Sequence, residues 1–262
     1  MLSTVRHAGE VLDLFTPERP EWGVTAAARQ LGIPKSRAHD LLASLTAIGL
    51  VEHVPHGCYR LGWRNLALAS TQLRTSPLRS EAEPVMREVA EDYTAPVLLF
   101  VWDRGWLLCV GRQDPTQPTH LSLPSVGARF RGNGSAAAKV LLAHRPSHEI
   151  AAVIGAGARD GNGSRSPETV EADLQRVRRR GYAAGRDGRS STPAVAAPIR
   201  DARENVIAAL SIANPKLQPD VGLPLYSDAI AGAAGRISQA LCEARSTFQG
   251  RPTTNRRRLS IA

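Results

Sequence analysis

Cysteine is scarce in this chain of 262 residues, and no apolar run is long enough to cross a membrane. Cys58, Cys109 and Cys242 stand far apart, without the spacing of a metal site or the even number of a disulfide framework. Isolated thiols of this kind suit a reducing compartment. The apolar runs fall short of the ~20 residues that a bilayer requires, and the first residues lack a signal-peptide pattern. We therefore expect a soluble, cytoplasmic protein.

Signatures of catalysis are also missing from the sequence. The seven histidines are scattered without a metal-ligand spacing such as H-E-x-x-H, and there is no G-x-S-x-G elbow. Residues 132–139 (GNGSAAAK) superficially resemble a phosphate-binding loop. They lack the Gly-Lys-Ser/Thr ending, and no acidic cluster for Mg²⁺ accompanies them. The sequence predicts neither an enzyme nor a cofactor or metal.

Residues 22–61 carry the most informative pattern of the chain. Apolar residues recur at helical spacing in two short segments that meet across a Gly-Ile-Pro turn. Thr25 can cap the first helix, Gly32 can end it in the left-handed conformation, and Pro34 can start the second helix. The pattern predicts a helix-turn-helix. The predicted buried stripe of its second helix consists of Ala38, Leu41, Leu42, Leu45 and Ile48.

The other side of this second helix is basic and polar. A helix with such an N-terminal half fits the major groove of DNA. Lys35, Ser36 and Arg37 are expected to reach phosphates and the first bases, with Thr25 nearby on the first helix. His39, Asp40 and Ser44 are expected to specify bases, although a carboxylate at Asp40 would repel phosphates. The alternative is an ordinary helical hairpin with a solvated face.

The pattern of residues 51–61 predicts a wing, formed by two short extended segments around a His-Gly tip. Gly57 supplies the turn. His56, Tyr59 and Arg60 are the candidate contacts of the wing to a phosphate or to the minor groove. Tyr59 could equally pack on Trp63, and Arg60 could be merely solvated.

The net charge of +9 adds little to the prediction of DNA binding, because of where it lies. Residues 1–73 contain seven basic side chains against six acidic ones, whereas five arginines and no acid follow Glu243. The last residues, 247–262, contain few apolar side chains and predict a basic, disordered tail. Such a tail can attract phosphates without sequence preference or can simply increase solubility.

The chain is too long for a DNA-binding module alone, so a second, larger domain is expected. An amphipathic helix over residues 4–15 precedes the helix-turn-helix, and a helix over 63–73 follows the wing. The expected division is a winged helix-turn-helix at residues 1–62, a linker helix at 63–76, an effector domain at 77–246, and the tail at 247–262.

Strands and helices alternate in the second domain. Strands are expected at residues 97–102, 106–110, 194–200 and 206–213. Helices are expected at residues 84–93, within 127–143 after a glycine-rich loop, at 166–180 and near 227–244, and a flexible Gly/Ser loop at 155–166. This alternation predicts a sensor-like sheet domain of the α/β or α+β class.

Over roughly residues 3–245, the sequence resembles the IclR family of transcriptional regulators in the order and spacing of several motifs. The resemblance implies an α+β protein: a mainly α winged helix-turn-helix joined by a linker helix to a GAF-like α/β effector-binding domain. It also implies dimers, often paired into tetramers, that bind operators and respond to small metabolites. The supporting stretches are LGIPKSRAHDLLASLTAIGLVE, YRLG at 59–62, GNGSAAAKVLLA at 132–143, RRRGYA at 178–183, and VAAPIRD…VIAALSIANP at 195–215.

The predicted effector site departs from the family pattern. The family has an acidic residue where Gly185 stands, a cysteine where Ala194 stands, and a second serine after Ser211. The amides of Gly134 and Ser135, at a helix start, could still hold a small carboxylate. These departures indicate a larger or more apolar ligand, or no ligand. The candidate effector residues are Arg129, Asn133, Gly134, Ser135, Gly185, Arg186, Ala194 and Ser211.

The sequence thus predicts a sequence-specific regulator whose binding to double-stranded operator DNA is modulated by a small-molecule effector. Its expected partners are operator DNA, an effector and a second copy of the chain, and no membrane. Because one recognition helix covers too few bases, the helices at 4–15 and 63–76 are the expected dimer surfaces. These stripes could instead pack within their own protomer. Alternative functions are a metabolite sensor without DNA binding and an effector-independent regulator with a degenerate pocket.

Overall fold

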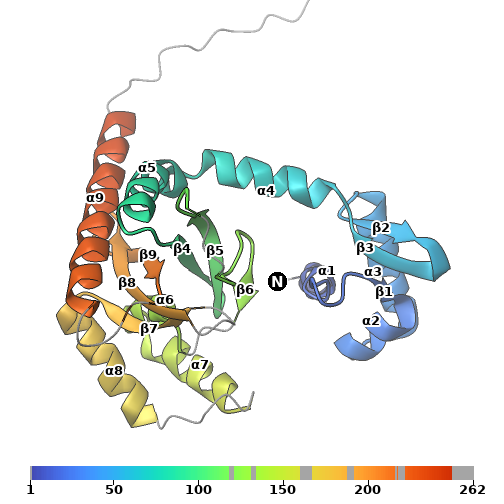
Figure 1. Cartoon of the computed structure of the whole chain (residues 1–262). Coiled ribbons are helices and arrows are strands. Elements are labelled where there is room, and N and C mark those ends of the chain that lie inside the picture. Colours follow the sequence, from blue (N-terminus) through green and yellow to red (C-terminus); the bar gives the residue numbers. More distant parts are fainter. Residues whose placement is uncertain are drawn as a thin grey trace, which may run out of the picture. The chain divides into compact units, whose positions relative to one another are not determined.

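The computed structural model describes residues 2–117, 121–130, 134–159, 167–187, 192–215, 217 and 222–249 (Figure 1). The chain forms two compact units, Met1–Thr75 and Ser76–Ala262. The division between them falls at the end of the predicted linker segment. In the described ranges, no helix combines the length and the hydropathy that a membrane span needs.

The first unit is a helix-turn-helix followed by a wing, as predicted. The wing strand β3 pairs with β2 on one side and with the short β1 on the other. The elements are α1 (Ser3–Leu12), β1 (Trp22–Gly23), α2 (Val24–Leu31), α3 (Lys35–Ala47), β2 (Val51–Val54), the 3₁₀ turn η1 (Pro55–Gly57), β3 (Cys58–Leu61) and α4 (Arg64–Thr75).

The turn between α2 and α3 follows the predicted chemistry at Gly32, but not at Thr25. Gly32 has φ 65°, and its left-handed conformation ends α2. The prediction that Thr25 caps α2 was wrong, because the helix already begins at Val24 and Gly23 is its N-cap. Thr25 instead lies exposed in the first turn.

The buried stripe of α3 contains Ala38, Leu41, Leu42 and Leu45. Ile48, predicted as its last member, is 49% exposed, because it is the C-cap, where the backbone leaves the helix and its periodicity. The stripe packs against Val11 of α1, Trp22 and Val51. The Trp22 indole N–H donates to the Leu14 carbonyl at 2.8 Å, so the one polar atom of this side chain is satisfied.

The second unit is built on an antiparallel sheet with the order β6-β5-β4-β9-β8-β7. Sequence-distant strands β4 and β9 pair at its centre, with Leu98 opposite Ser211. The strands are β4 (Val97–Asp103), β5 (Trp106–Gln113), β6 (Arg129–Phe130), β7 (Ala183–Asp187), β8 (Thr192–Arg200) and β9 (Val206–Ala213). The four predicted strands are all present, within this mixed α+β unit.

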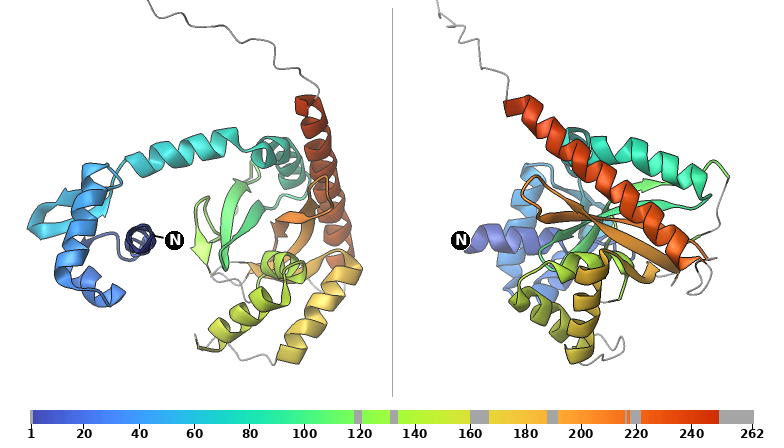
Figure 2. Two further views of the ribbon diagram at one scale, coloured as in Figure 1. Left: turned by 180° about the vertical axis from the view of Figure 1, so that it is seen from behind. Right: turned by 90° about the vertical axis from the view of Figure 1, so that its left-hand side faces the viewer.

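Helices cover both faces of the sheet (Figure 2). One face packs against α6 (Ala136–Ala143), α7 (Ser147–Arg159) and α8 (Pro167–Arg180), and we call this the α6 face. The other face packs against α5 (Pro77–Asp92) and α9 (Leu223–Gln249), and we call it the α9 face. Each face has its own apolar core, so side chains on consecutive strand positions enter different cores.

Several expected boundaries differ from the structure, including that of the helix expected at 4–15, which ends at Leu12. The helix predicted from Pro84 begins at Pro77, capped by Ser76, and Pro84 lies inside it, where the buried Met86 and Val89 hold the helix against the sheet. Helix α7 continues to Arg159 through part of the predicted 155–166 loop, since a helical glycine costs only about 1 kcal/mol. The rest of that loop lies outside the described residues.

The predicted tail also begins too early, because α9 extends through residues 247–249. Residues 247–249 contain no strong helix breaker, and the next ones in the sequence are Gly250 and Pro252, which explains why α9 extends this far. The remainder of the predicted tail lies outside the described residues.

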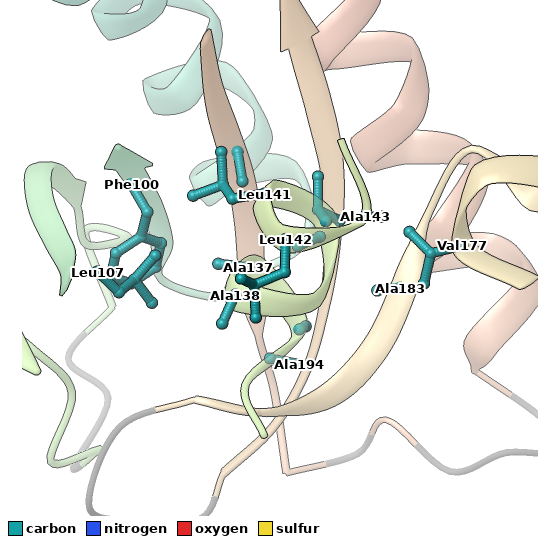
Figure 3. Packing of buried hydrophobic residues seen from close by; sticks show 14 of the residues in the cluster. Phe100, Leu107, Ala137, Ala138, Leu141, Leu142, Ala143, Val177, Ala183 and Ala194 are labelled. Carbon is teal, nitrogen blue, oxygen red and sulfur yellow. The ribbon is translucent and has the colours of Figure 1, made fainter. Parts of the chain in front are cut away.

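Helix α6 packs within the α6-face core (Figure 3), and it carries polar caps at both ends. Ser135 accepts a hydrogen bond from the Ala138 amide at 3.1 Å at the N-terminus. The Arg178 guanidinium of α8 donates to the Ala143 carbonyl at the C-terminus, where a cation also complements the helix dipole. His144 follows as the C-cap.

The half-buried His144 should make stability depend on pH. Burial lowers the pKa of His144 from its ordinary value of 6.5, and the charges of Arg200 and Arg178 lower it further. Below about pH 6.5 the unfolded chain therefore binds a proton at His144 that the folded unit does not bind, so the free energy of unfolding falls as pH drops.

We expect His144→Gln to lose this part of the pH dependence of stability, measured by denaturant unfolding at neutral and mildly acidic pH. The exposed His148→Gln should retain it; equal pH dependence in His144→Gln and wild type would contradict the assignment.

Candidate DNA-binding and effector sites

The exposed surface of α3 contains all the residues predicted to contact DNA from this helix. Their side chains are exposed because the opposite stripe is buried against α1 and the wing. The helix thus offers a continuous set of donors and acceptors from its first turn onward, in the arrangement that major-groove recognition uses. These residues are Lys35, Ser36, Arg37, His39, Asp40 and Ser44.

Arg37 makes contacts that the sequence did not predict. Its Nη2 lies 3.3 Å from the Ser3 hydroxyl and 3.2 Å from His7 Nδ1, both on α1. A guanidinium has five N–H donors, and these contacts occupy only one of its nitrogens. Arg37 therefore joins α1 to the start of α3 and keeps further donors for an external acceptor.

Asp40 is accompanied by two polar neighbours on the same helix. His39 Nδ1 lies 3.6 Å from Asp40 Oδ1, and the Ser44 hydroxyl donates to the Asp40 carbonyl at 2.7 Å. The Asp40 side chain is 80% exposed, so its carboxylate is open to an external donor such as cytosine N4.

The wing has the predicted His-Gly tip. His56 and Gly57 both have positive φ, 65° and 72°, and His56 is exposed. Arg60 is directly opposite Glu52 and forms an ion pair with it, so a phosphate must compete with that carboxylate. Tyr59 is only 6% exposed and meets the His53 ring edge-on, which favours a packing role for Tyr59.

The packing partner expected for Tyr59 was wrong. Trp63 is 75% exposed and stands outside the core that contains Tyr59. The strand register explains this, because Tyr59 is opposite Trp22 on β1, and it is Trp22 that shares its core.

Five of the candidate effector residues come together where the start of α6 meets the sheet. Gly185 of β7 is opposite Ala194 of β8, and both lie on the α6 face. A Cβ on Gly185 would lie 2.7 Å from the Ala136 nitrogen, so β7 directly abuts the start of α6. This contact leaves no room there for the acidic side chain that the family pattern has at this position. The five residues are Gly134, Ser135, Gly185, Ala194 and Ser211.

Small side chains form the contact between α6 and the sheet (Figure 3). Ser211 is fully buried and is opposite Ala196, while Ala137 and Ala138 belong to the same core from the helix side. Alanine and serine allow the helix backbone to approach the strands closely.

Strand alternation separates the two candidate arginines from this cluster. Phe130 packs into the α6-face core, so its neighbour Arg129 is directed to the other face, where its guanidinium stacks 4.5 Å from the Trp106 ring centroid. Arg186 follows Gly185 and by the same alternation is directed away from α6. The remaining candidate, Asn133, lies outside the described residues.

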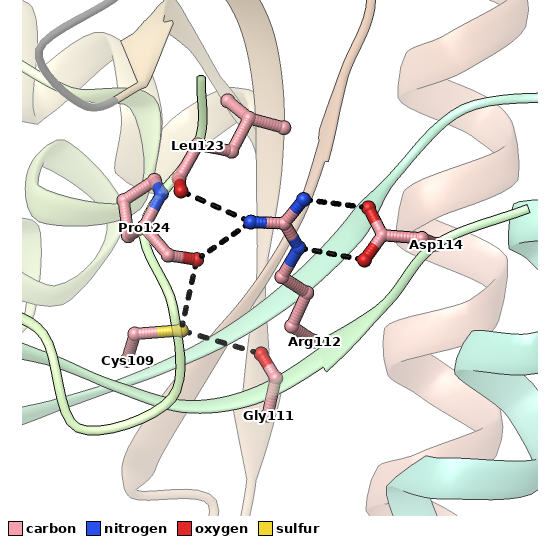
Figure 4. A network of polar contacts seen from close by, with 6 residues as sticks. All are labelled: Cys109, Gly111, Arg112, Asp114, Leu123 and Pro124. Carbon is pink, nitrogen blue, oxygen red and sulfur yellow. Dashed lines mark hydrogen bonds and ion pairs between the residues drawn. The ribbon is translucent and has the colours of Figure 1, made fainter. Parts of the chain in front are cut away.

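Arg112, which the sequence did not point to, lies in register with Ser211 across Leu98. Its guanidinium makes two 2.8 Å hydrogen bonds to Asp114, and Nη1 donates to the Leu123 carbonyl at 3.0 Å (Figure 4). Cys109 adds a thiol contact of 4.0 Å to the Pro124 carbonyl. Arg112 thus fastens the segment around Leu123 to β5. The signal in the sequence is an arginine and an aspartate two residues apart at the end of an apolar strand.

The Gly185 contact makes a direct prediction about stability. Gly185→Ala should force β7 away from the start of α6 and lower the free energy of unfolding by about 1–3 kcal/mol. Gly134→Ala is the matched control, because a Cβ there meets nothing within 4 Å; it should change stability by less than about 0.5 kcal/mol. Denaturant unfolding of both variants measures the difference. Equal effects at the two glycines would show that β7 and α6 are not in tight contact.

The two units together define a class of protein. A winged helix-turn-helix with an exposed polar recognition helix, followed in the chain by a sheet unit of the sensor type, is the organisation of a DNA-binding transcriptional regulator. Residues 4–55 match the IclR helix-turn-helix domain, and residues 70–239 match the family described as "Bacterial transcriptional regulator IclR C-terminal". The chain belongs to the IclR family of transcriptional regulators.

Curated relatives are regulators by name. The chain is 26% identical to the HTH-type transcriptional regulator KipR of Bacillus subtilis, over 91% of this chain and 96% of that protein. It is 27% identical to the acetate operon repressor of Salmonella typhimurium, over 79% and 77% of the two chains. It is 28% identical to the glycerol operon regulatory protein of Streptomyces griseus, over 92% and 96%.

Solved structures of the family have the same fold. An IclR family regulator from Brucella abortus superimposes with a TM-score of 0.79 at 21% identity, covering 92% of this chain and 93% of that one. An IclR homologue from Microbacterium hydrocarbonoxydans, in complex with 4-hydroxybenzoate, superimposes with a TM-score of 0.69 at 25% identity, covering 91% and 99%.

Proposed function

We propose that this regulator binds a specific operator through α3 and the wing, and that a small molecule in the second unit modulates this binding. The observation that carries the proposal is the polarity of α3: its apolar stripe is buried, while Lys35, Ser36, Arg37, His39, Asp40 and Ser44 are all exposed. Within residues 2–75, which the structure describes in full, the side-chain contacts of this face are those of Arg37 to α1 and those among His39, Asp40 and Ser44 on α3 itself. DNA is the partner whose chemistry fits it.

The proposed contacts divide by chemistry. Side chains at the starts of α2 and α3 and on the wing position the protein on phosphates, while those farther along α3 select bases. Tyr59 is assigned to packing. The positioning set is Thr25, Lys35, Ser36, His56 and Arg60. The base-reading set is Arg37, His39, Asp40 and Ser44.

We further propose that two copies bind together. A single recognition helix reads too few base pairs, and a two-fold pair doubles the site. Large apolar side chains are exposed at the N-cap and first turn of α1, at Leu2 and Val5, and just before and along α4, at Trp63, Leu66 and Leu68. Burying these side chains against a second copy removes them from water. Sedimentation distinguishes dimers from tetramers.

The effector is proposed to bind where α6 starts, beside Ser135, Ala194 and Ser211. The family membership supports this place, and the apolar lining with few hydroxyl groups supports a ligand more apolar than a small carboxylate. A solved relative in complex with 4-hydroxybenzoate shows that an IclR homologue can hold an aromatic acid. The close contact of Gly185 with Ala136 favours the second candidate, a regulator that works without an effector.

Fluorescence anisotropy tests the proposed function. The purified protein is titrated onto DNA that flanks its own gene and onto a scrambled duplex, at several salt concentrations. Binding that strongly favours the genomic duplex supports a regulator and provides an operator. Equal, steeply salt-dependent binding to both duplexes means that only non-specific charge attraction operates on this DNA.

Two arginines should respond differently in that assay. Arg37→Ala should cost about 1–3 kcal/mol of operator binding if Arg37 reads a guanine, whereas Arg60→Ala should mainly flatten the salt dependence. Arg87→Ala, at an exposed arginine of α5 in the second unit, is the charge-matched control and should alter neither. If both variants behave like this control, Arg37 and Arg60 do not contact DNA.

Ser211 provides the test of the effector site. Small aromatic and aliphatic carboxylic acids, including 4-hydroxybenzoate, are screened for a change in operator affinity. Ser211→Leu should abolish the response to any active compound, because the larger side chain takes the place proposed for the ligand beside α6, while operator affinity stays within about twofold. Ser147→Leu, at an exposed position of α7, should respond like wild type. A normal response in Ser211→Leu places the ligand elsewhere.

A further inference from the structure

The C-terminal end of the recognition helix α3 is satisfied by residues from the start of α4. The Ile48 carbonyl accepts a hydrogen bond from Arg64 Nη1 at 2.6 Å. The Leu50 carbonyl accepts from Asn65 Nδ2 at 2.6 Å and from the Gly62 amide at 2.9 Å. These carbonyls belong to the end of α3 and the turn after it, where a helix has no partners of its own.

Asn65 connects the two segments with a single amide group. Besides its bond to the Leu50 carbonyl, Asn65 Nδ2 donates to the Gly62 carbonyl at 2.9 Å. Asn65 is half-buried, so these two bonds are partly shielded from competing water. Both donor hydrogens of the amide are thus used to hold the turn after α3 against the entrance to α4.

The backbones are in direct contact at the same place. A Cβ on Gly62 would overlap the Gly49 carbonyl oxygen and lie 3.1 Å from the Gly49 carbonyl carbon. Gly49 itself has φ 75°, and a Cβ placed on it would lie 3.7 Å from the Cβ and Cδ of Arg64. Gly62 therefore allows the close approach of the two backbones, and Gly49 allows the left-handed conformation of the turn.

This polar contact is a principal attachment of α4 within the first unit. None of its side chains is fully buried, and Trp63, Leu66 and Leu68 are largely exposed. A helix without a buried stripe has little apolar packing to fix its direction. Its orientation must then come chiefly from its first turn, where Arg64 and Asn65 hold it to α3.

We infer that Arg64 and Asn65 are positioning residues that fix the recognition helix to the linker helix, so that α3 turns together with α4. The inference rests on the proposed binding of DNA through α3. In a dimer that pairs through α4, this connection sets the separation of the two recognition helices, and therefore which half-site spacing fits. Neither residue needs to touch DNA for this effect.

The experiment compares operator and scrambled DNA for variants with matched controls. Arg64→Ala is paired with Arg74→Ala, an exposed arginine in the last turn of the same helix. Asn65→Asp removes both amide donors at nearly constant shape, and it is paired with Gln72→Glu, which makes the same charge change at an exposed position of α4. The ratio of the two dissociation constants separates positioning from general attraction to DNA.

We expect Arg64→Ala and Asn65→Asp each to reduce the operator-to-scrambled ratio at least about fivefold. Arg74→Ala and Gln72→Glu should leave this ratio within about twofold of wild type. Arg64→Lys, which retains a donor for the Ile48 carbonyl, should restore most of the ratio. Circular dichroism confirms folding. If Asn65→Asp unfolds, Arg64→Ala decides, because its side chain is exposed and its loss leaves the core intact.

Three results would overturn the inference, and they can be told apart. If the wild type discriminates the operator and folded Arg64→Ala does so equally well, the connection has no positioning role. The connection also has no such role if the control variants lose as much discrimination as their partners. If the wild type itself does not discriminate any operator, the proposed DNA-binding function fails, and the inference that rests on it fails with it.

Discussion

Burial of one side of α3 is the constraint on which the DNA-binding unit depends. Each of its buried leucines contributes about 1.5–3 kcal/mol when removed from water, and Leu41, Leu42 and Leu45 do so together. Because these leucines must face the core, the rotation of α3 about its own axis is fixed, and this rotation exposes the polar residues. The contacts at the two ends of the helix, from Arg37 to α1 and from Asn65 to the turn after α3, then fix its tilt. Apolar packing thus determines which face of α3 is exposed, and the hydrogen bonds at its ends determine the direction of its axis.

The second unit depends on the close packing of α6 against the sheet. Helix α6 rests on alanine, serine and glycine positions, and the contact at Gly185 permits no side chain at all. A site built this way can respond to a ligand only if α6 or β7 moves, because differential binding to two arrangements is what shifts an equilibrium. The same closeness leaves no room at Gly185 for the acidic side chain of the family pattern.

Local features were predictable from the sequence, and long-range register was not. Gly32 and the His56-Gly57 tip follow from single-residue preferences, and the α3 stripe follows from periodicity over a few residues. Ile48 was misjudged because periodicity does not reveal where a helix ends. Arg129 and Arg186 were assigned to the effector site by proximity in the sequence, although one residue of register decides the sheet face. The roles of Arg37 and Arg112 depend on contacts with segments that no local pattern could bring together.

The sheet order also dictates when each unit can form during synthesis. The first unit closes its core with residues 11–59, all near in sequence, so it can fold while the rest of the chain is still being made. In the second unit, β4 at residues 97–103 pairs at the sheet centre with β9 at residues 206–213. That central pair cannot form until the whole stretch between the two strands has left the ribosome. The regulator therefore acquires its DNA-reading surface before the unit that is proposed to control it.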